Sequence, residues 1–479
     1  MNISLNKVFK NNKILKNFSV LTLSNAVTQL LFIFSSIRIA RVLTPLTYGT
    51  YNLLQLHISI FVVIASLGVR NIVIRSIARD KLILKKLFYI SAILRTGGFL
   101  LSILIFFIYY LLYHNYSNIL FIWVIVAVLA TSFLDLFESV AFGLEKMELS
   151  GLINLSSTLL WVFSILIIPV SKLTVNSIFG LFVIFGLLKT IAYFFLLYKD
   201  KYLKGFTLSL VKKEDLLLFS KECFPYYYLG LFTLLSNQIP LLFLEYRSGV
   251  EQIGFFNIAS KVLMPINLVF TTILAAVFPN LSRLFVSNLK GFIKNVKLIF
   301  VLIAIFGIAG AFGVTLFRKE VVQLLYGEKY INSSLVMGYQ CWYIAVYSLV
   351  CLIGTILGAI NRQKELSYLS IACTIIQVPI LWYGAKYGAQ YLSAAFLFAT
   401  SIIFFIHIYV INRYLKKELS YRFYFKISAL FIIGYTVSLL APVSLSFVTK
   451  SIIFILFSSI GGYFMYYRYI DTIKKIFAL

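Results

Sequence analysis

The chain is poor in charge, and above all in acidic residues. Only 12% of its 479 residues are Asp, Glu, Lys or Arg, whereas soluble domains carry about 25%. The 16 acidic residues are outnumbered by 43 Lys and Arg, and 61% of the chain is hydrophobic. A water-soluble protein of this composition would lack the charges to cover its surface. The composition therefore excludes secreted, nuclear and cytosolic proteins and predicts a polytopic membrane protein.

Cysteine, histidine and nucleotide motifs are equally scarce. The four cysteines form no CxxC pair and the three histidines stand apart, so we expect no metal site and no cofactor. No Walker A run and no paired-carboxylate or DxD motif is present. The basic residues lie in short segments between apolar runs, which is typical of membrane proteins rather than of nucleic-acid-binding proteins.

Long apolar runs predict fourteen transmembrane helices, because each run approaches the roughly 20 residues that span a bilayer. Helices are expected, since an open strand edge in hydrocarbon leaves backbone groups unpaired. The runs fall at about 18–40, 51–74, 88–112, 118–142, 150–170, 177–198, 222–245, 254–282, 297–317, 334–359, 366–384, 391–411, 427–446 and 450–469.

The basic residues predict the orientation of these spans. With the N-terminus placed inside, 30 of the 43 Lys and Arg fall in inner segments, eight in outer segments and five within spans. Cytoplasmic segments of membrane proteins carry such an excess. We therefore expect both termini to be cytoplasmic.

A repeated loop pattern divides the chain into two halves. Gly49, Tyr51 and Asn52 follow the first span, and an equivalent Gly-aromatic-Asn group follows the seventh at a constant offset of 205 residues. Chance recurrence of a common turn is the alternative. Parallel halves are typical of transporters, which bind cargo between them. The predicted domains are an N-terminal lobe of six spans (1–198), a basic linker (199–221), a C-terminal lobe of six spans (222–412) and two further spans (413–479).

Several segments in order resemble the polysaccharide-export flippases of the MATE-like (MOP) superfamily, the Wzx type. They are RIARVLTPLTYGTYN at 38–52, IRSIAR at 74–79, GLEKM at 143–147, IGFFNIASK at 253–261 and LYGEKY at 325–330. The resemblance covers about 18–412 and implies a MATE-like fold in a bacterial inner (cytoplasmic) membrane. It implies a non-enzymatic flippase, in contact with membrane lipids, that translocates an undecaprenyl-diphosphate-linked oligosaccharide such as an O-antigen unit across this membrane. A polysaccharide polymerase and chain-length proteins would be its partners.

Cations within the spans are the candidate cargo-binding residues. A charge near the middle of a bilayer costs about 2.5–3.5 kcal/mol on insertion scales and so needs a partner or a function. Lys261 coincides by resemblance with a cavity cation of lipid II flippases and is the leading candidate; pairing with a nearby carboxylate is its alternative. Arg38 and Arg41 share one helix face, and Arg41 can instead extend to water. Arg70 is either an interface anchor or a first contact for the diphosphate.

Two carboxylates and one histidine are candidates for ion coupling. Asp135 and Glu138 lie one turn apart near the inner end of the fourth span. They would exchange H+ or bind Na+ if their pKa values differ, or pair with Arg95 or Lys189 on adjacent helices. His57 is a core or cavity polar group in the second span.

Two other functions agree less well with the sequence than a flippase does. A MATE-type multidrug or toxin antiporter exports organic cations and requires an acidic cavity, whereas basic residues outnumber acidic ones within these spans. A membrane-bound glycosyltransferase or polymerase is disfavoured because the longest predicted outer loop, 318–333, is short.

Overall fold

A computed structural model describes residues 12–113, 117–199, 211–415, 421–440 and 445–459. These residues form helices joined by short connections, with no strand among them. The helices are α2 (Asn12–Val42), α3 (Pro45–Ser66), α4 (Val69–Arg79), α5 (Leu84–Tyr113), α6 (Asn118–Gly143), α7 (Met147–Ile167), α8 (Val175–Lys199), α9 (Lys213–Asn237), α10 (Ile239–Ser248), α11 (Val250–Ser287), α12 (Leu289–Tyr326), α13 (Ser333–Ala359), α14 (Gln363–Ala385), α15 (Ala389–Tyr414) and α16 (Tyr421–Leu440), with 3-10 turns at Val170–Lys172 and Glu328–Tyr330.

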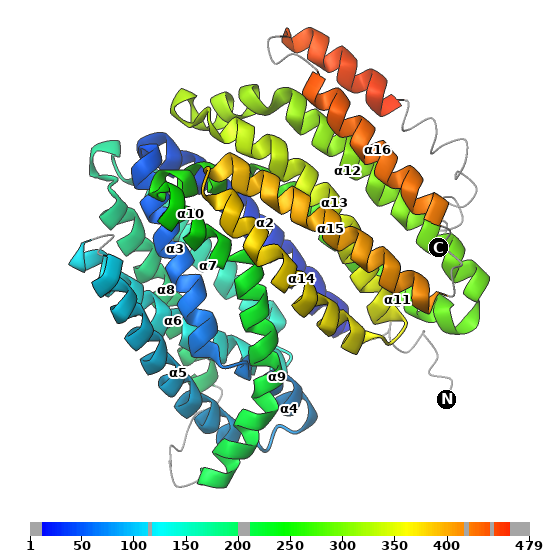
Figure 1. The fold of residues 1–479 in the computed structure, drawn as a ribbon. Coiled ribbons are helices and arrows are strands. Elements are labelled where there is room, and N and C mark those ends of the chain that lie inside the picture. Colours follow the sequence, from blue (N-terminus) through cyan, green and yellow to red (C-terminus); the bar gives the residue numbers. More distant parts are fainter. Residues whose placement is uncertain (1–11, 114–116, 200–210, 416–420, 441–444, 460–479) are drawn as a thin grey trace. The chain divides into compact units, whose positions relative to one another are not determined.

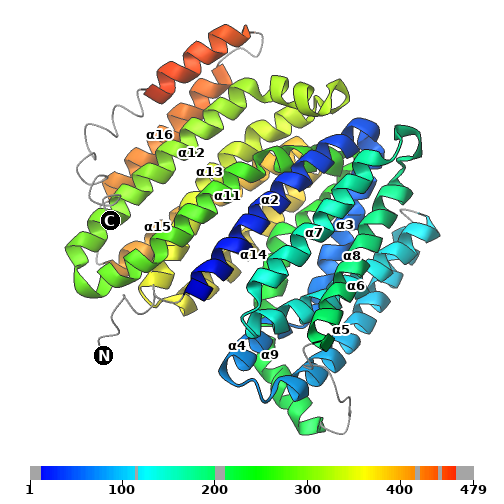
Figure 2. The ribbon, with the colours of Figure 1, turned by 180° about the vertical axis from the view of Figure 1, so that it is seen from behind.

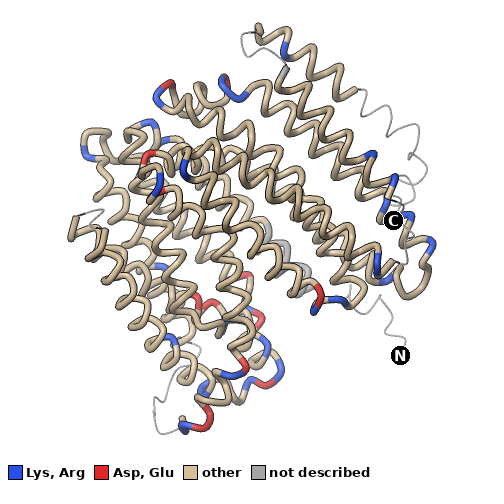
Figure 3. The backbone as a smooth tube through the Cα atoms, in the orientation of Figure 1, with Lys and Arg blue, Asp and Glu red and all other residues tan. Residues whose placement is uncertain are grey.

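The predicted all-helical membrane fold is confirmed. In the described part of the chain, thirteen helices are long and apolar enough to cross a membrane, with α9 and α10 counted as one. A shorter apolar helix, Phe447–Ser459, lies where the fourteenth span is predicted. The remainder of that span, 460–469, lies outside the described residues. Lys and Arg gather mainly at helix ends and connections (Figure 3).

The chain forms two compact units, which divide between Ile239 and Pro240. Unit 1 contains α2–α9 and unit 2 contains α10–α16 (Figure 1). The division falls within the predicted seventh span, because α9 ends at Asn237 and α10 starts at Ile239. Pro240 has no N–H to donate to the preceding turn, so a continuous hydrogen-bonded helix cannot pass through this point unchanged.

In unit 1, α6 occupies the centre, with contacts to α3, α4, α5, α7 and α8. The helix α2 packs along α7, which in turn lies beside α8 (Figure 2). A buried apolar cluster joins the ends of α4, α5, α6, α8 and α9, and it includes Ile72, Val73, Leu136, Val140 and Leu197. The polar side chains of α6 therefore lie next to a densely apolar region.

In unit 2, α13 is the central helix and packs against α11, α12, α14 and α15. Its Trp342 is 1% exposed and donates from Nε1 to Thr315 Oγ1 at 3.0 Å. Ser248 Oγ donates to the Ala385 carbonyl at 2.6 Å, and Gln252 Oε1 accepts from the Ala389 N–H at 3.0 Å. These bonds attach α10 and the start of α11 to the turn between α14 and α15.

Local sequence explains where the second predicted span begins and breaks. Pro45 occupies the first turn of α3, where a missing N–H costs little. Thr44 and Thr47 form a reciprocal capping box. The helix ends at Leu67 and Gly68, which have φ of 47° and 72°. The predicted span 51–74 is thus two helices, and its last residues belong to α4.

Gly68→Ala should destabilise unit 1. A left-handed conformation costs a side-chain-bearing residue about 1–2 kcal/mol, and an added Cβ would lie 2.5 Å from the Tyr227 N and 2.6 Å from the Cys223 O of α9. We expect a lower melting temperature of the purified protein in detergent. Gly97→Ala is the matched control, because nothing lies within 4 Å of its added Cβ. Equal melting temperatures for the two variants would contradict the close contact between Gly68 and α9.

Candidate functional site

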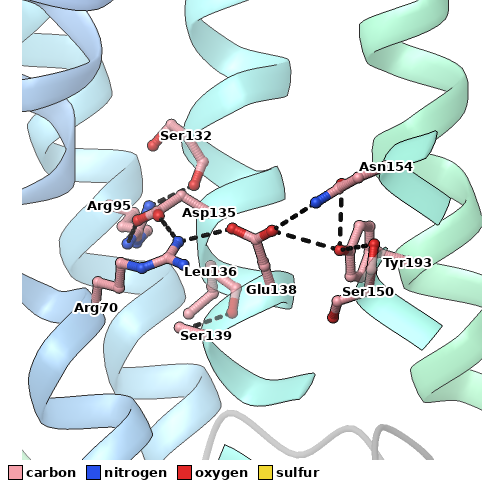
Figure 4. A network of polar contacts seen from close by, with 10 residues as sticks. All are labelled: Arg70, Arg95, Ser132, Asp135, Leu136, Glu138, Ser139, Ser150, Asn154 and Tyr193. Carbon is pink, nitrogen blue, oxygen red and sulfur yellow. Dashed lines mark hydrogen bonds and ion pairs between the residues drawn. The ribbon is translucent and has the colours of Figure 1, made fainter. Parts of the chain in front are cut away.

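The candidate site in unit 1 is built around two carboxylates of α6. Asp135 and Glu138 lie one turn apart and point to the same side of the helix (Figure 4). Arg95 of α5 has a side chain that is 0% exposed, and it donates to both the Asp135 carboxylate and the Ser132 carbonyl. The guanidinium therefore has two acceptors on α6 although protein covers it completely.

A second guanidinium joins the two carboxylates. Arg70, near the start of α4, donates from Nη1 to Asp135 and, at 2.9 Å, to Glu138 Oε2. Its Cζ also lies 5.3 Å from the centroid of the Phe142 ring, within the range of a cation–π contact. Because α4 starts immediately after Gly68, the break in the second predicted span positions Arg70 for this contact.

Glu138 continues the network toward two further helices. Its Oε1 accepts from Asn154 Nδ2 of α7 at 3.1 Å and from the Tyr193 hydroxyl of α8 at 3.5 Å. The same hydroxyl lies 3.3 Å from the Ser150 carbonyl oxygen. The network thus connects α4, α5, α6, α7 and α8 within unit 1 (Figure 4).

The charges of this network balance. Two arginines face two carboxylates, and each carboxylate has at least one ion pair. Breaking a buried pair by removing one partner is strongly destabilising, because it leaves a buried charge uncompensated. Lys189 of α8 is a further positive charge close enough to attract the Glu138 carboxylate electrostatically. The two side chains do not form an ion pair within 4.0 Å among the described residues. In this arrangement neither acid is available as an uncompensated site for a cation.

His57 lies away from this network, in the core of unit 1. Its side chain is 1% exposed and contacts the rings of Phe61, Phe106 and Tyr109, the last at a centroid distance of 5.0 Å. This placement agrees with a core polar group. Its role in ion coupling stays a prediction.

Arg38 and Arg41, predicted to share one helix face, differ in burial. Arg38 is half-buried, and its Nη2 lies 3.5 Å from the Leu166 carbonyl oxygen in the last turn of α7. Cations are favourable at helix C-termini, where backbone carbonyls lack partners. Arg41 is exposed. Of the two, Arg38 therefore has a visible structural function in joining α2 to α7.

Lys261 is half-buried on α11 of unit 2, about three turns from the start of that helix. The preceding residue, Ser260, donates to Gln340 Oε1 of α13 at 3.1 Å. Pro265 follows one turn later, inside the helix. Its cargo-binding role stays a prediction.

Sequence reasoning missed several parts of the network. Arg95 was among the expected partners of the carboxylates, whereas the contact with Arg70 and the contributions of Asn154 and Tyr193 were not. A polar residue in an apolar helix was the only available signal for Asn154. In unit 2, Lys450 is 1% exposed and pairs with Glu320 of α12 at 2.5 Å.

The helical architecture has the fold of the MOP superfamily of transporters, as comparison with solved structures shows. The lipid II flippase MurJ in an inward closed conformation matches with a TM-score of 0.70 at 14% identity, over 94% of this chain and 99% of that one. An inward-facing MATE-family multidrug resistance transporter matches with a TM-score of 0.64 at 15% identity, over 82% and 96%. The Vibrio cholerae MATE transporter VcmN matches with a TM-score of 0.54 at 14% identity, over 86% and 98%.

The family follows from the sequence itself. Residues 14–285 match the family described as "Polysaccharide biosynthesis protein". The match covers more than half of the chain, so the protein belongs to this family, as its loop motifs suggest. No curated protein matches the chain in sequence.

Proposed function

We propose that the protein translocates an undecaprenyl-diphosphate-linked oligosaccharide, such as an O-antigen or another surface polysaccharide unit, across a bacterial cytoplasmic membrane by alternating access. Membership of the polysaccharide biosynthesis family supports a saccharide cargo. The fold shared with a lipid II flippase supports a lipid-linked one. Transport of this kind involves no covalent step, and both chain termini would be cytoplasmic.

The neutralised acids of unit 1 are the observation that most favours this function over organic-cation export. Asp135 and Glu138, the acidic pair on α6, are both bound by arginine. A cationic drug would have to displace Arg70 or Arg95 to reach them. An anionic diphosphate would instead be attracted to basic residues, of which Lys261 is the candidate in unit 2 and Arg38, Arg41 and Arg70 are candidates in unit 1.

The coupling ion is part of the same proposal. H+ or Na+ would bind at Glu138 in a state in which Arg70 has released it, and at Asp135 in a state in which both Arg70 and Arg95 have released it. The ion pairs favour a structural function for these acids in the state described. The membrane potential is then the alternative source of drive, and His57 the alternative protonation site.

Proteoliposomes test the flippase proposal directly. Fluorescent undecaprenyl-diphosphate disaccharide is placed in both leaflets, and a membrane-impermeant reagent bleaches the outer leaflet. We expect the protein to render the protected fraction accessible within minutes, whereas protein-free vesicles retain it. Ethidium efflux driven by an H+ or Na+ gradient, without movement of the lipid, would instead identify a multidrug antiporter.

A deletion strain provides the cellular counterpart. Loss of the gene should leave lipid-linked repeat units on the inner leaflet, where a polymerase cannot reach them. The measurement is the sugar composition of the lipid-linked pool and of the cell surface. Normal surface glycan in a strain with no second exporter would contradict the proposal.

A further inference from the structure

A pocket within unit 1 lies among α2, α6, α7 and α8, next to the carboxylate network. Its volume is about 220 Å³. The side chains that define its chemistry are Phe32, Thr131, Ser157, Trp161, Phe182 and Lys189. Concave sites with mostly apolar walls and a few convergent polar groups are the usual form of small-ligand sites.

One end of the pocket is aromatic. Trp161 is 4% exposed and lies 5.4 Å from the Phe32 ring and 6.1 Å from the Phe182 ring, the latter edge-on. Its Nε1 is buried and has no acceptor among the described residues. Buried donors are almost always satisfied, so a pocket occupant with an acceptor atom would complete this one.

The opposite end carries Lys189. In the described ranges, this lysine forms no hydrogen bond and no ion pair within 4.0 Å. The carboxylate that attracts it electrostatically is that of Glu138. Glu138 is already bound by Arg70 and Asn154. With Lys189 included, three cations face two carboxylates in this region, so one positive charge remains in excess.

The backbone register sets the distance between the two ends. Ser157 Oγ donates to the Phe185 carbonyl at 3.2 Å, which places these residues of α7 and α8 level with each other. Trp161 lies four residues after Ser157 on α7, and Lys189 lies four residues after Phe185 on α8. Because the two helices are antiparallel, Trp161 and Lys189 are displaced from this level in opposite directions. At 1.5 Å per residue the separation along the helices is about 12 Å. Ser157 and Thr131 supply hydroxyls between them.

We propose that this pocket binds a single sugar ring that carries one anionic group, as a hexuronate or a hexose phosphate does. The apolar face of the ring would contact Trp161 and Phe182, the sugar hydroxyls would bond with Ser157 and Thr131, and Lys189 would bind the anionic group. A volume of 220 Å³ equals about seven waters at roughly 30 Å³ each. That is too small for a lipid-linked oligosaccharide, so the site is distinct from the proposed cargo path.

Trp161 fluorescence tests the proposal, because the chain has four tryptophans and Trp161 alone lines the pocket. The full chain with Trp123→Phe, Trp342→Phe and Trp382→Phe, in detergent, is titrated with glucose 1-phosphate or glucuronate. We expect a saturable change in emission, and an affinity for uncharged glucose at least tenfold lower. Equilibrium dialysis of labelled glucose 1-phosphate against the chain with all four tryptophans gives the same answer if the triple variant folds poorly.

Lysine variants locate the binding. Lys189→Gln should weaken glucose 1-phosphate binding at least tenfold, and Lys189→Arg should retain it. Lys172→Gln is the matched control, because this exposed lysine lies outside the pocket. No saturable binding, equal binding of glucose, or unchanged binding by Lys189→Gln would overturn the proposal. Binding of phenyl phosphate in place of the sugar phosphate would also overturn it. None of these measurements depends on transport, so they are independent of the flippase assay.

Discussion

Arg95→Leu is expected to cause a severe loss of stable protein. Arg95 is fully covered and binds both Asp135 and the Ser132 carbonyl. Removing one partner of a buried ion pair costs about 3–5 kcal/mol when the other charge remains without compensation. Asp135 keeps its pair with Arg70, so the cost here should lie near the lower end of that range. We expect a sharply lower yield of monodisperse protein and a lower melting temperature, measured by size-exclusion chromatography after heating in detergent.

The pair itself, rather than the arginine, is the expected cause. The double variant Arg95→Leu with Asp135→Leu removes both charges and leaves Arg70 paired with Glu138. Its melting temperature should lie well above that of Arg95→Leu. A double variant as unstable as the single one would indicate that Arg95 acts through the Ser132 carbonyl and its packing instead.

The helical fold was predictable because each span is a long apolar run with basic residues at one side. The breaks within the second and seventh predicted spans could not be located in the same way. Leu67 and Gly68 interrupt a predicted span, and the few polar residues beside them do not by themselves distinguish a break from a continuous span. The turn is favoured by the close approach of Gly68 to the α9 backbone, and such a contact between distant segments is not visible in local composition. The second break, between α9 and α10, lies beside Pro240, whose missing N–H interrupts the hydrogen bonding of the helix.

The candidate site was predictable in its residues and not in its pairings. The spacing of Asp135 and Glu138 placed them on one helix face. The cost of charges in a membrane indicated that they need basic partners, of which Arg95 is one. Which partner each takes depends on how α4, α5 and α6 pack. Arg70 was therefore interpreted as an interface anchor or a diphosphate contact, and its ion pairs emerge only from the structure.

Lys261→Glu is expected to abolish most transport while leaving the protein in the membrane. In a region with an effective dielectric constant near 20, two unit charges 4 Å apart interact by about 4 kcal/mol. Replacing attraction with repulsion toward a diphosphate should therefore slow flipping by far more than tenfold, since about 1.4 kcal/mol corresponds to a factor of ten. Lys261→Arg, which keeps the charge, should retain transport in the same vesicle assay.

Two comparisons separate cargo binding from a general effect of charge on unit 2. Lys290→Glu makes the same charge change at an exposed position at the start of α12, and it should transport at the normal rate. Lys261→Gln removes the attraction without adding repulsion, so its rate should lie between those of the parent protein and Lys261→Glu. If Lys261→Glu inserts normally and flips the lipid at full rate, the diphosphate does not pass this lysine. The remaining cations, Arg38, Arg41 and Arg70, would then have to bind the cargo from unit 1.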